Sequence, residues 1–172
     1  MECSAKPWFF VNSDMVRYAR MLSNPKLTDM RVAKAVYQLV SGRFEVKLSS
    51  LRPWAFYRLQ PSCEIWNTAV QPPMKVAFGL LSMLFLTERF DDIRLYSTSL
   101  KYGVFRRPHY YVRLKIREKR YDLDPLVYHT GGKFGEHLGK DGAETEVPAI
   151  KHPCREHLQI RENVFHLCGL TP

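Results

Sequence analysis

The sequence predicts a single α+β domain over residues 1–172, with a helical N-terminal part and a central apolar helix packed on an antiparallel sheet. Apolar residues recur at helical spacing before residue 43, and a long apolar segment follows from Met74 to Phe90. Apolar and polar residues then alternate from His109 to Arg117, which is the period of a strand with one buried face. A 45% apolar fraction and 13% aromatic residues favour a folded core over disorder.

The N-terminal part should contain two helices. Ser13 and Asp14 can cap a helix over residues 15–22. Thr28 or Asp29 can cap a second helix, which Gly42 should end. Two extended runs, 44–48 and 54–59, come next, and Pro61 interrupts the second.

Cys63 follows this break and begins a run that can be helical. A helix N-terminus stabilises a thiolate, so Cys63 is a candidate nucleophile. The alternative is that Cys63 is a small buried residue beside Ile65 and Trp66.

The central helix, Met74–Phe90, should lead into a strand over Asp91–Tyr96 and then into a hairpin. The predicted apolar face of the hairpin comprises Tyr110, Val112, Leu114, Ile116, Tyr121 and Leu123, and the other face holds His109, Asp122 and Asp124. With a two-residue turn at Arg117 and Glu118, Ile116 pairs with Lys119 and His109 lies diagonal to Asp124. A four-residue turn instead places Arg113 opposite Asp124, and the sequence leaves both registers open. The alternative for this hairpin is a solvated basic strand whose His and Asp are surface residues.

Residues 129–148 are rich in glycine and predict a long surface loop within the domain, which could form a flap near the candidate site. Their spacing lacks the Lys-Ser/Thr and the following helix of a phosphate-binding loop. Glu144 and Glu146 are expected to be solvated rather than catalytic.

The segment from His109 through Tyr121-Asp122-Leu123-Asp124-Pro125 resembles the signature of the transglutaminase-like superfamily, in which a His opens one strand and Leu-Asp-Pro closes the next. The resemblance implies a papain-like fold and a thiol enzyme. It assigns Cys63 as nucleophile, His109 as its base and Asp124 as the residue that orients the imidazole, with Asp122 as an alternative orienter. Gln60 is the corresponding candidate for an oxyanion donor.

This resemblance implies acyl transfer through a thioacyl intermediate, which would make the chain an amidase, deamidase, protease or transamidase acting on a protein. In that family the nucleophile begins the helix that leads into the next strand, which here is near Pro73 and Met74. Either an insertion returns Cys63 to the helix start, or the fold is used without thiol chemistry to bind a partner protein.

Charge suggests a third function. The net charge is +9, and residues 89–120 hold ten Lys and Arg against three Asp and Glu, a local charge of +7. Such a patch would attract an acidic protein partner. It would also suit nucleic acid, with phosphates bound by Arg106, Arg107, Arg113, Lys115 and Arg117 and bases stacked on Tyr96, Tyr102, Tyr110 and Tyr111.

The four cysteines are too scattered for a disulfide framework, and no cofactor is expected. Cys154, His157, His166 and Cys168 could enclose zinc if residues 158–167 folded as a hairpin, but the spacing matches no common zinc module, and two incidental cysteines on a hairpin are the alternative. The N-terminus lacks a secretory pattern, and the longest apolar run is too short to span a bilayer. We therefore expect a soluble cytoplasmic protein that does not bind membranes, and the sequence is also compatible with delivery into another cell.

Overall fold

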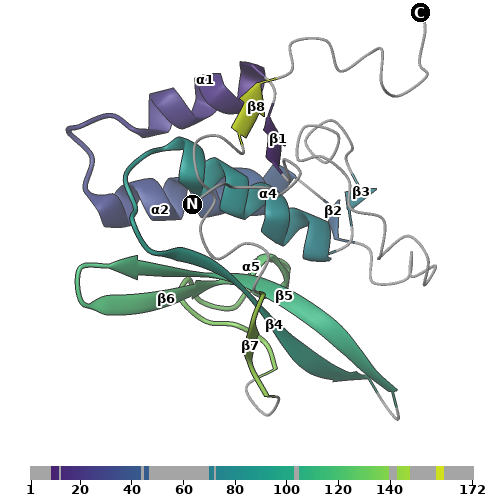
Figure 1. The fold of residues 1–172 in the computed structure, drawn as a ribbon. Coiled ribbons are helices and arrows are strands. Elements are labelled where there is room, and N and C mark those ends of the chain that lie inside the picture. The colour runs from purple at the N-terminus through teal and green to yellow at the C-terminus, as the bar shows by residue number, and fades with distance from the viewer. Residues whose placement is uncertain are drawn as a thin grey trace, which may run out of the picture.

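The structure is a computed structural model, and it describes residues 9–11, 13–43, 45–46, 70–71, 73–102, 105–139, 143–147 and 158–160. It has the predicted α+β class. Helices α1 (Ser13–Leu22), α2 (Asp29–Arg43) and α4 (Pro73–Leu86) lie on one side of an antiparallel four-stranded sheet (Figure 1).

Helix α4 is the centre of the core. It contacts α1 and α2 as well as strands β4 and β5, so it is covered on more than one side. This explains why its sequence is apolar almost throughout rather than along one stripe. From Val76 to Leu84 every residue except the partly buried Phe78 is buried, and the hydroxyl of Ser82 donates to the carbonyl oxygen of Phe78 (3.0 Å).

The sheet has the strand order β6-β5-β4-β7, with β4 (Ile93–Tyr102), β5 (Phe105–Ile116), β6 (Lys119–Leu123) and β7 (Thr145–Glu146). Ile116 pairs with Lys119 and Val112 pairs with Leu123, which confirms the two-residue turn at Arg117 and Glu118. The side chains of Val112, Leu114, Ile116 and Leu123 enter the core beneath α4, as predicted.

Helix α2 begins where the sequence indicated, because the hydroxyl of Thr28 accepts the N–H of Arg31 (3.4 Å). Helix α4 ends at Leu86, four residues before the predicted end at Phe90. The Thr87 hydroxyl donates to the carbonyl oxygen of Leu84 (2.6 Å), and Glu88 adopts a φ of 53°. A left-handed residue directly after a helix stops its propagation.

Strand β5 begins at Phe105, so His109 lies inside a strand rather than at its start. The sequence suggests a start at His109 because the alternation of apolar and polar residues begins there. Strand β6 pairs with β5 only as far as Val112, and β7 pairs with β4 at Tyr96 and Ser97. The ends of β4 and β5 therefore form a two-stranded ribbon that extends away from the helices (Figure 1).

Two short parallel pairs were not expected. Strand β1 (Phe9–Val11) pairs with β8 (Leu158–Ile160), and β2 (Glu45–Val46) pairs with β3 (Val70–Gln71). Parallel strands that are distant in the sequence are not joined by a tight turn, so no turn motif in the sequence predicts their pairing. The predicted extended run at residues 54–59 lies outside the described residues.

Candidate active site

Asp124 joins strand β6 to helix α5 (Pro125–His129). It is the N-cap of α5, and its Oδ1 accepts the N–H of Leu126 (2.8 Å). Pro125 follows at the first helical position, where a residue without an N–H and with a fixed φ is favoured. The Leu-Asp-Pro sequence is thus a strand end, a helix cap and a helix start in succession, and the cap fixes the rotamer of the carboxylate.

His109 comes from β5, beside Thr98 of β4, and faces the same side of the sheet as Tyr111 and Arg113. Its Nε2 donates to Oδ2 of Asp124 (2.7 Å). The side chain of His109 is 3% exposed and that of Asp124 is 0% exposed. Because a carboxylate only accepts, the proton of neutral His109 is on Nε2 and its Nδ1 is the basic nitrogen. Among the described residues, Nδ1 has no hydrogen-bond partner.

The backbone of Asp124 is held from the helical side. The Tyr37 hydroxyl of α2 donates to the Asp124 carbonyl oxygen (2.7 Å). Burial, followed by the charge of Asp124, raises the pKa of Tyr37, so this phenol stays protonated and remains a donor. Helices and sheet are therefore linked directly at the candidate site.

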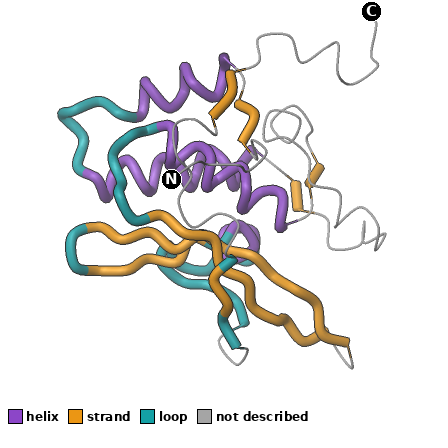
Figure 2. The backbone as a smooth tube through the Cα atoms, in the orientation of Figure 1, coloured by secondary structure: helices purple, strands orange, loops and turns teal. Residues whose placement is uncertain are grey.

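The chain after α5 wraps around the β6 edge and covers the face of the sheet opposite the helices (Figure 2). Gly135 bridges to Asp122 at that edge, and the ring of His137 stacks on Tyr111 with centroids 4.3 Å apart. The Leu138 N–H donates to Oδ2 of Asp124 (2.9 Å), and the Thr98 hydroxyl donates to the Gly139 carbonyl oxygen (3.1 Å). We call residues 135–139 the covering segment.

Gly139 is required for this close approach. Its φ is +86°, and a Cβ placed there would lie 2.9 Å from Cγ2 of Thr98. Any other residue would combine an unfavourable backbone conformation with a clash. The glycine content of the predicted loop thus has a structural reason next to His109.

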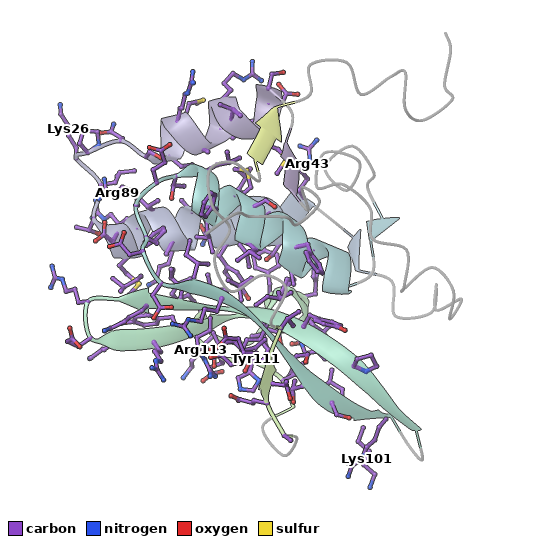
Figure 3. All side chains as sticks on the ribbon, viewed as in Figure 1. Lys26, Arg43, Arg89, Lys101, Tyr111 and Arg113 are labelled. Atoms are coloured by element: carbon purple, nitrogen blue, oxygen red, sulfur yellow. The ribbon has the colours of Figure 1, made fainter. Side chains whose placement is uncertain are left out.

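Tyr111 and Arg113, beside the candidate pair, belong to a network of ion pairs on this face (Figure 3). Arg113 binds both carboxylate oxygens of Asp122 (2.6 and 2.9 Å) and one oxygen of Glu144 (3.0 Å). The bond with Asp122 raises the pKa of Arg113. Burial acts to raise the pKa of Glu144, but the hydrogen bond and charge of Arg113 outweigh it and lower that pKa.

His137 connects the covering segment to this network. Its Nδ1 donates to the Leu138 carbonyl oxygen (2.8 Å), and its Nε2 lies 3.0 Å from Oε1 of Glu144. Neither His137 nor Glu144 was predicted as part of the site. A histidine inside a glycine-rich stretch gives no periodic signal, so only the fold could place it here.

The predicted site residues separate into three groups. His109 and Asp124 meet, whereas Asp122 pairs with Arg113 instead of the imidazole. Cys63 and Gln60 lie outside the described residues. The proposed zinc ligands Cys154, His157, His166 and Cys168 also lie outside them, and β8, within the suggested hairpin, pairs with β1. Within the described ranges, no cluster of His, Cys, Asp or Glu could hold a metal ion.

The basic stretch 89–120 does not form one patch. Four carboxylates from outside it, Asp29, Asp122, Glu144 and Glu146, pair with its arginines. Tyr111 is fully buried and Arg113 is bound to carboxylates, so neither is free to contact a base or phosphate. Among the described residues of this stretch, the exposed cations without an ion-pair partner lie near the two ends of β5, and they are Lys101, Arg106, Arg117, Lys119 and Arg120.

The chain matches no family model, and no curated protein matches it. In the part of the chain that the structure describes, no helix is both long enough and apolar enough to cross a membrane.

Proposed function

We propose that the chain is a thiol-dependent acyl-transfer enzyme of the transglutaminase-like type, with Cys63 as nucleophile, His109 as general base and Asp124 as the orienting carboxylate. The observation that carries the proposal is the buried bond between His109 Nε2 and Asp124 Oδ2 (2.7 Å). It leaves Nδ1 as the basic nitrogen of the ring, which is the group that a thiol nucleophile requires.

The environment of Asp124 supports this role. Its carboxylate accepts N–H groups from His109, Leu126 and Leu138, so it can remain ionised although it is fully buried. An ionised carboxylate fixes the tautomer of the neutral ring and stabilises the imidazolium that forms when the base takes a proton. The pair is therefore preorganised for proton transfer at Nδ1.

In the proposed reaction, Nδ1 of His109 takes the thiol proton and the Cys63 thiolate attacks a carboxamide or ester carbonyl of a protein substrate. The imidazolium returns the proton to the leaving amine or alcohol, which gives a thioacyl intermediate. Attack by water then completes hydrolysis or deamidation, and attack by an amine completes transamidation.

The test is the alkylation rate of each cysteine by iodoacetamide, followed by mass spectrometry between pH 5 and 9. Cys63 should react much faster than Cys3, Cys154 and Cys168 near neutral pH, because a neighbouring base produces a thiolate. His109→Gln should slow the alkylation of Cys63 to the rate of the other cysteines. Equal rates at all four cysteines, with no effect of His109→Gln, would exclude the proposed pair.

A second candidate is a catalytically silent protein of the same type that binds a partner protein. The specific observation that favours it is the 3% exposure of the His109 side chain, on the sheet face opposite α4. In that case the His109–Asp124 bond is a buried structural pair. An inert Cys63 together with a saturable protein partner would support this candidate over the enzyme.

A further inference from the structure

A groove separate from the candidate site lies between the start of α2 and the turn that joins β5 to β6. Its volume is about 600 Å³. It begins at Ile116, seven residues along β5 from His109, which corresponds to roughly 23 Å of extended strand. Its lining comes from residues 28–30 at the start of α2 and from residues 116–119 and 121 around the turn.

The floor of the groove is apolar. Ile116 belongs to the buried core, and Met30 and Tyr121 are partly buried hydrophobic residues packed against that core. Because Met30 and Tyr121 keep part of their surface exposed, a ligand that covers them removes apolar surface from water. The groove can therefore accept an apolar side chain.

The rim of the groove holds two carboxylates and two cations, but only the cations lack ion-pair partners among the described residues. Its two carboxylates are already paired, Asp29 with Arg89 (2.6 Å) and Glu118 with Lys115 (3.4 Å). Arg117 and Lys119 are exposed and have no ion-pair partner among the described residues. A ligand with carboxylates on either side of an apolar group would match this distribution.

The backbone of Arg117 adds an independent observation. Its φ is 54°, a left-handed conformation that glycine adopts without strain and that a residue with a Cβ resists. An arginine thus occupies the turn position that best suits glycine, and its side chain is held beside the groove. Backbone strain of this kind is a reason to look for a binding function.

We propose that this groove docks an acidic segment of a partner protein, with an apolar side chain over Met30 and Tyr121 and flanking carboxylates at Arg117 and Lys119. A peptide fits better than a nucleic acid, because the floor is apolar and only two unpaired cations line the groove. The inference does not depend on acyl transfer. If the enzyme proposal also holds, the groove is a second contact for the protein substrate.

The test is fluorescence anisotropy with a short labelled peptide that carries one phenylalanine between glutamates. Arg117→Gly with Lys119→Gln should weaken binding about tenfold, since it removes both cations and leaves the turn in a favourable conformation. The matched control is Lys101→Gln with Arg106→Gln, which removes two exposed cations from the β4–β5 ribbon, at the opposite end of β5 from the groove, and should change binding less than about twofold. Met30→Glu should abolish binding by placing a carboxylate in the groove.

Three results would overturn the proposal. In the first, the control pair weakens binding as much as the groove pair, which indicates attraction to overall charge. In the second, a peptide with alanine in place of phenylalanine binds equally well, which shows that the floor is not used. In the third, a single-stranded oligonucleotide binds more tightly than the peptide and displaces it, which assigns the surface to nucleic acid. Circular dichroism of each variant establishes that it is folded.

Discussion

The carboxylate of Asp124 receives N–H groups from a strand, a helix start and the covering segment. Each bond to a buried charge contributes more than a bond at the surface, and removal of the charge leaves the donors without an acceptor. Asp124 therefore holds three segments together, whatever its part in catalysis.

We expect Asp124→Asn to lower the free energy of unfolding by about 2–4 kcal/mol. An asparagine side chain has the same shape, but its NH₂ group must face at least one of the three N–H donors. Urea denaturation followed by circular dichroism measures the change. Asp91→Asn, at an exposed position, should change stability by less than about 0.5 kcal/mol. Similar small effects for both variants would show that the carboxylate is not essential to the fold.

The ion pair of Glu144 with Arg113 should make the free energy of unfolding depend on pH. The pKa of Glu144 is lowered from the ordinary 4.5 by Arg113. A lowered pKa contributes stability that is present above the unfolded value and is lost as the pH falls through the folded value. The side chain is 33% exposed, so solvent screening limits the contribution to about 0.5–1 kcal/mol.

We therefore expect Glu144→Gln to be less stable than the natural sequence at pH 7 by this amount, and the difference should disappear as the pH falls below 4.5. Urea midpoints measured from pH 7 to pH 3 report it. Glu136→Gln is the control, because Glu136 is an exposed acid of the covering segment with no described ion pair. A difference between Glu144→Gln and the natural sequence that stays constant with pH would contradict the assignment.

At the level of elements, the β5–β6 hairpin depends on a turn that carries an arginine in a left-handed conformation. Such a position costs a residue with a Cβ about 1–2 kcal/mol. Glu118, the other turn residue, is not left-handed. The two positions therefore respond in opposite ways to glycine.

Arg117→Gly should raise the free energy of unfolding by roughly 0.5–1 kcal/mol, because relief of strain exceeds the entropy that glycine adds to the unfolded chain. Glu118→Gly should lower it by a similar amount, since only the entropy changes. Thermal unfolding of both variants measures these two changes in the free energy of unfolding. If both substitutions destabilise the protein equally, strain at Arg117 is not significant.

The elements that could be predicted from the sequence are those with a local pattern. Alternation from Tyr110 to Leu123 predicts the hairpin and its buried face, and it places His109 and Asp124 together on the opposite face. The helix cap at Thr28 has local chemistry as well, whereas Gly42, the predicted stop, lies inside α2, which continues to Arg43. Helix α5 was missed because it has only five residues, too few to show a helical period.

The parts that could not be predicted depend on contacts between distant segments. The sequence placed Tyr111 on a polar face, yet it is fully buried because His137 stacks on it. The +7 stretch indicated one basic patch, but its arginines meet carboxylates from residues 29, 122, 144 and 146. Charge counted along the chain therefore overstates the charge available to a partner.

Across the whole molecule, stability should be uneven. Strands β4 and β5 cross the core at Leu95 and Val112, where α4 covers one face and neighbouring strands pair on both sides. Further along, at Leu100 and Arg106, the same two strands pair only with each other, and the ribbon extends away from the helices toward Lys101 (Figure 3). An isolated two-stranded ribbon has little stability of its own in water.

We expect native-state hydrogen exchange to divide these strands in the middle. Amides near Leu95, Val112 and Leu114 should exchange only through global unfolding, whereas those near Leu100 and Arg106 should exchange at least about 100-fold faster through local opening. Exchange followed by NMR, residue by residue, gives the boundary, which we place near Thr98, whose hydroxyl donates to the Gly139 carbonyl oxygen of the covering segment. Asp124→Asn should move this boundary toward Leu95, because the covering segment loses its bond to the carboxylate. Uniform protection along the whole of β4 in both proteins would mean that the ribbon unfolds together with the core and is not a separate unit.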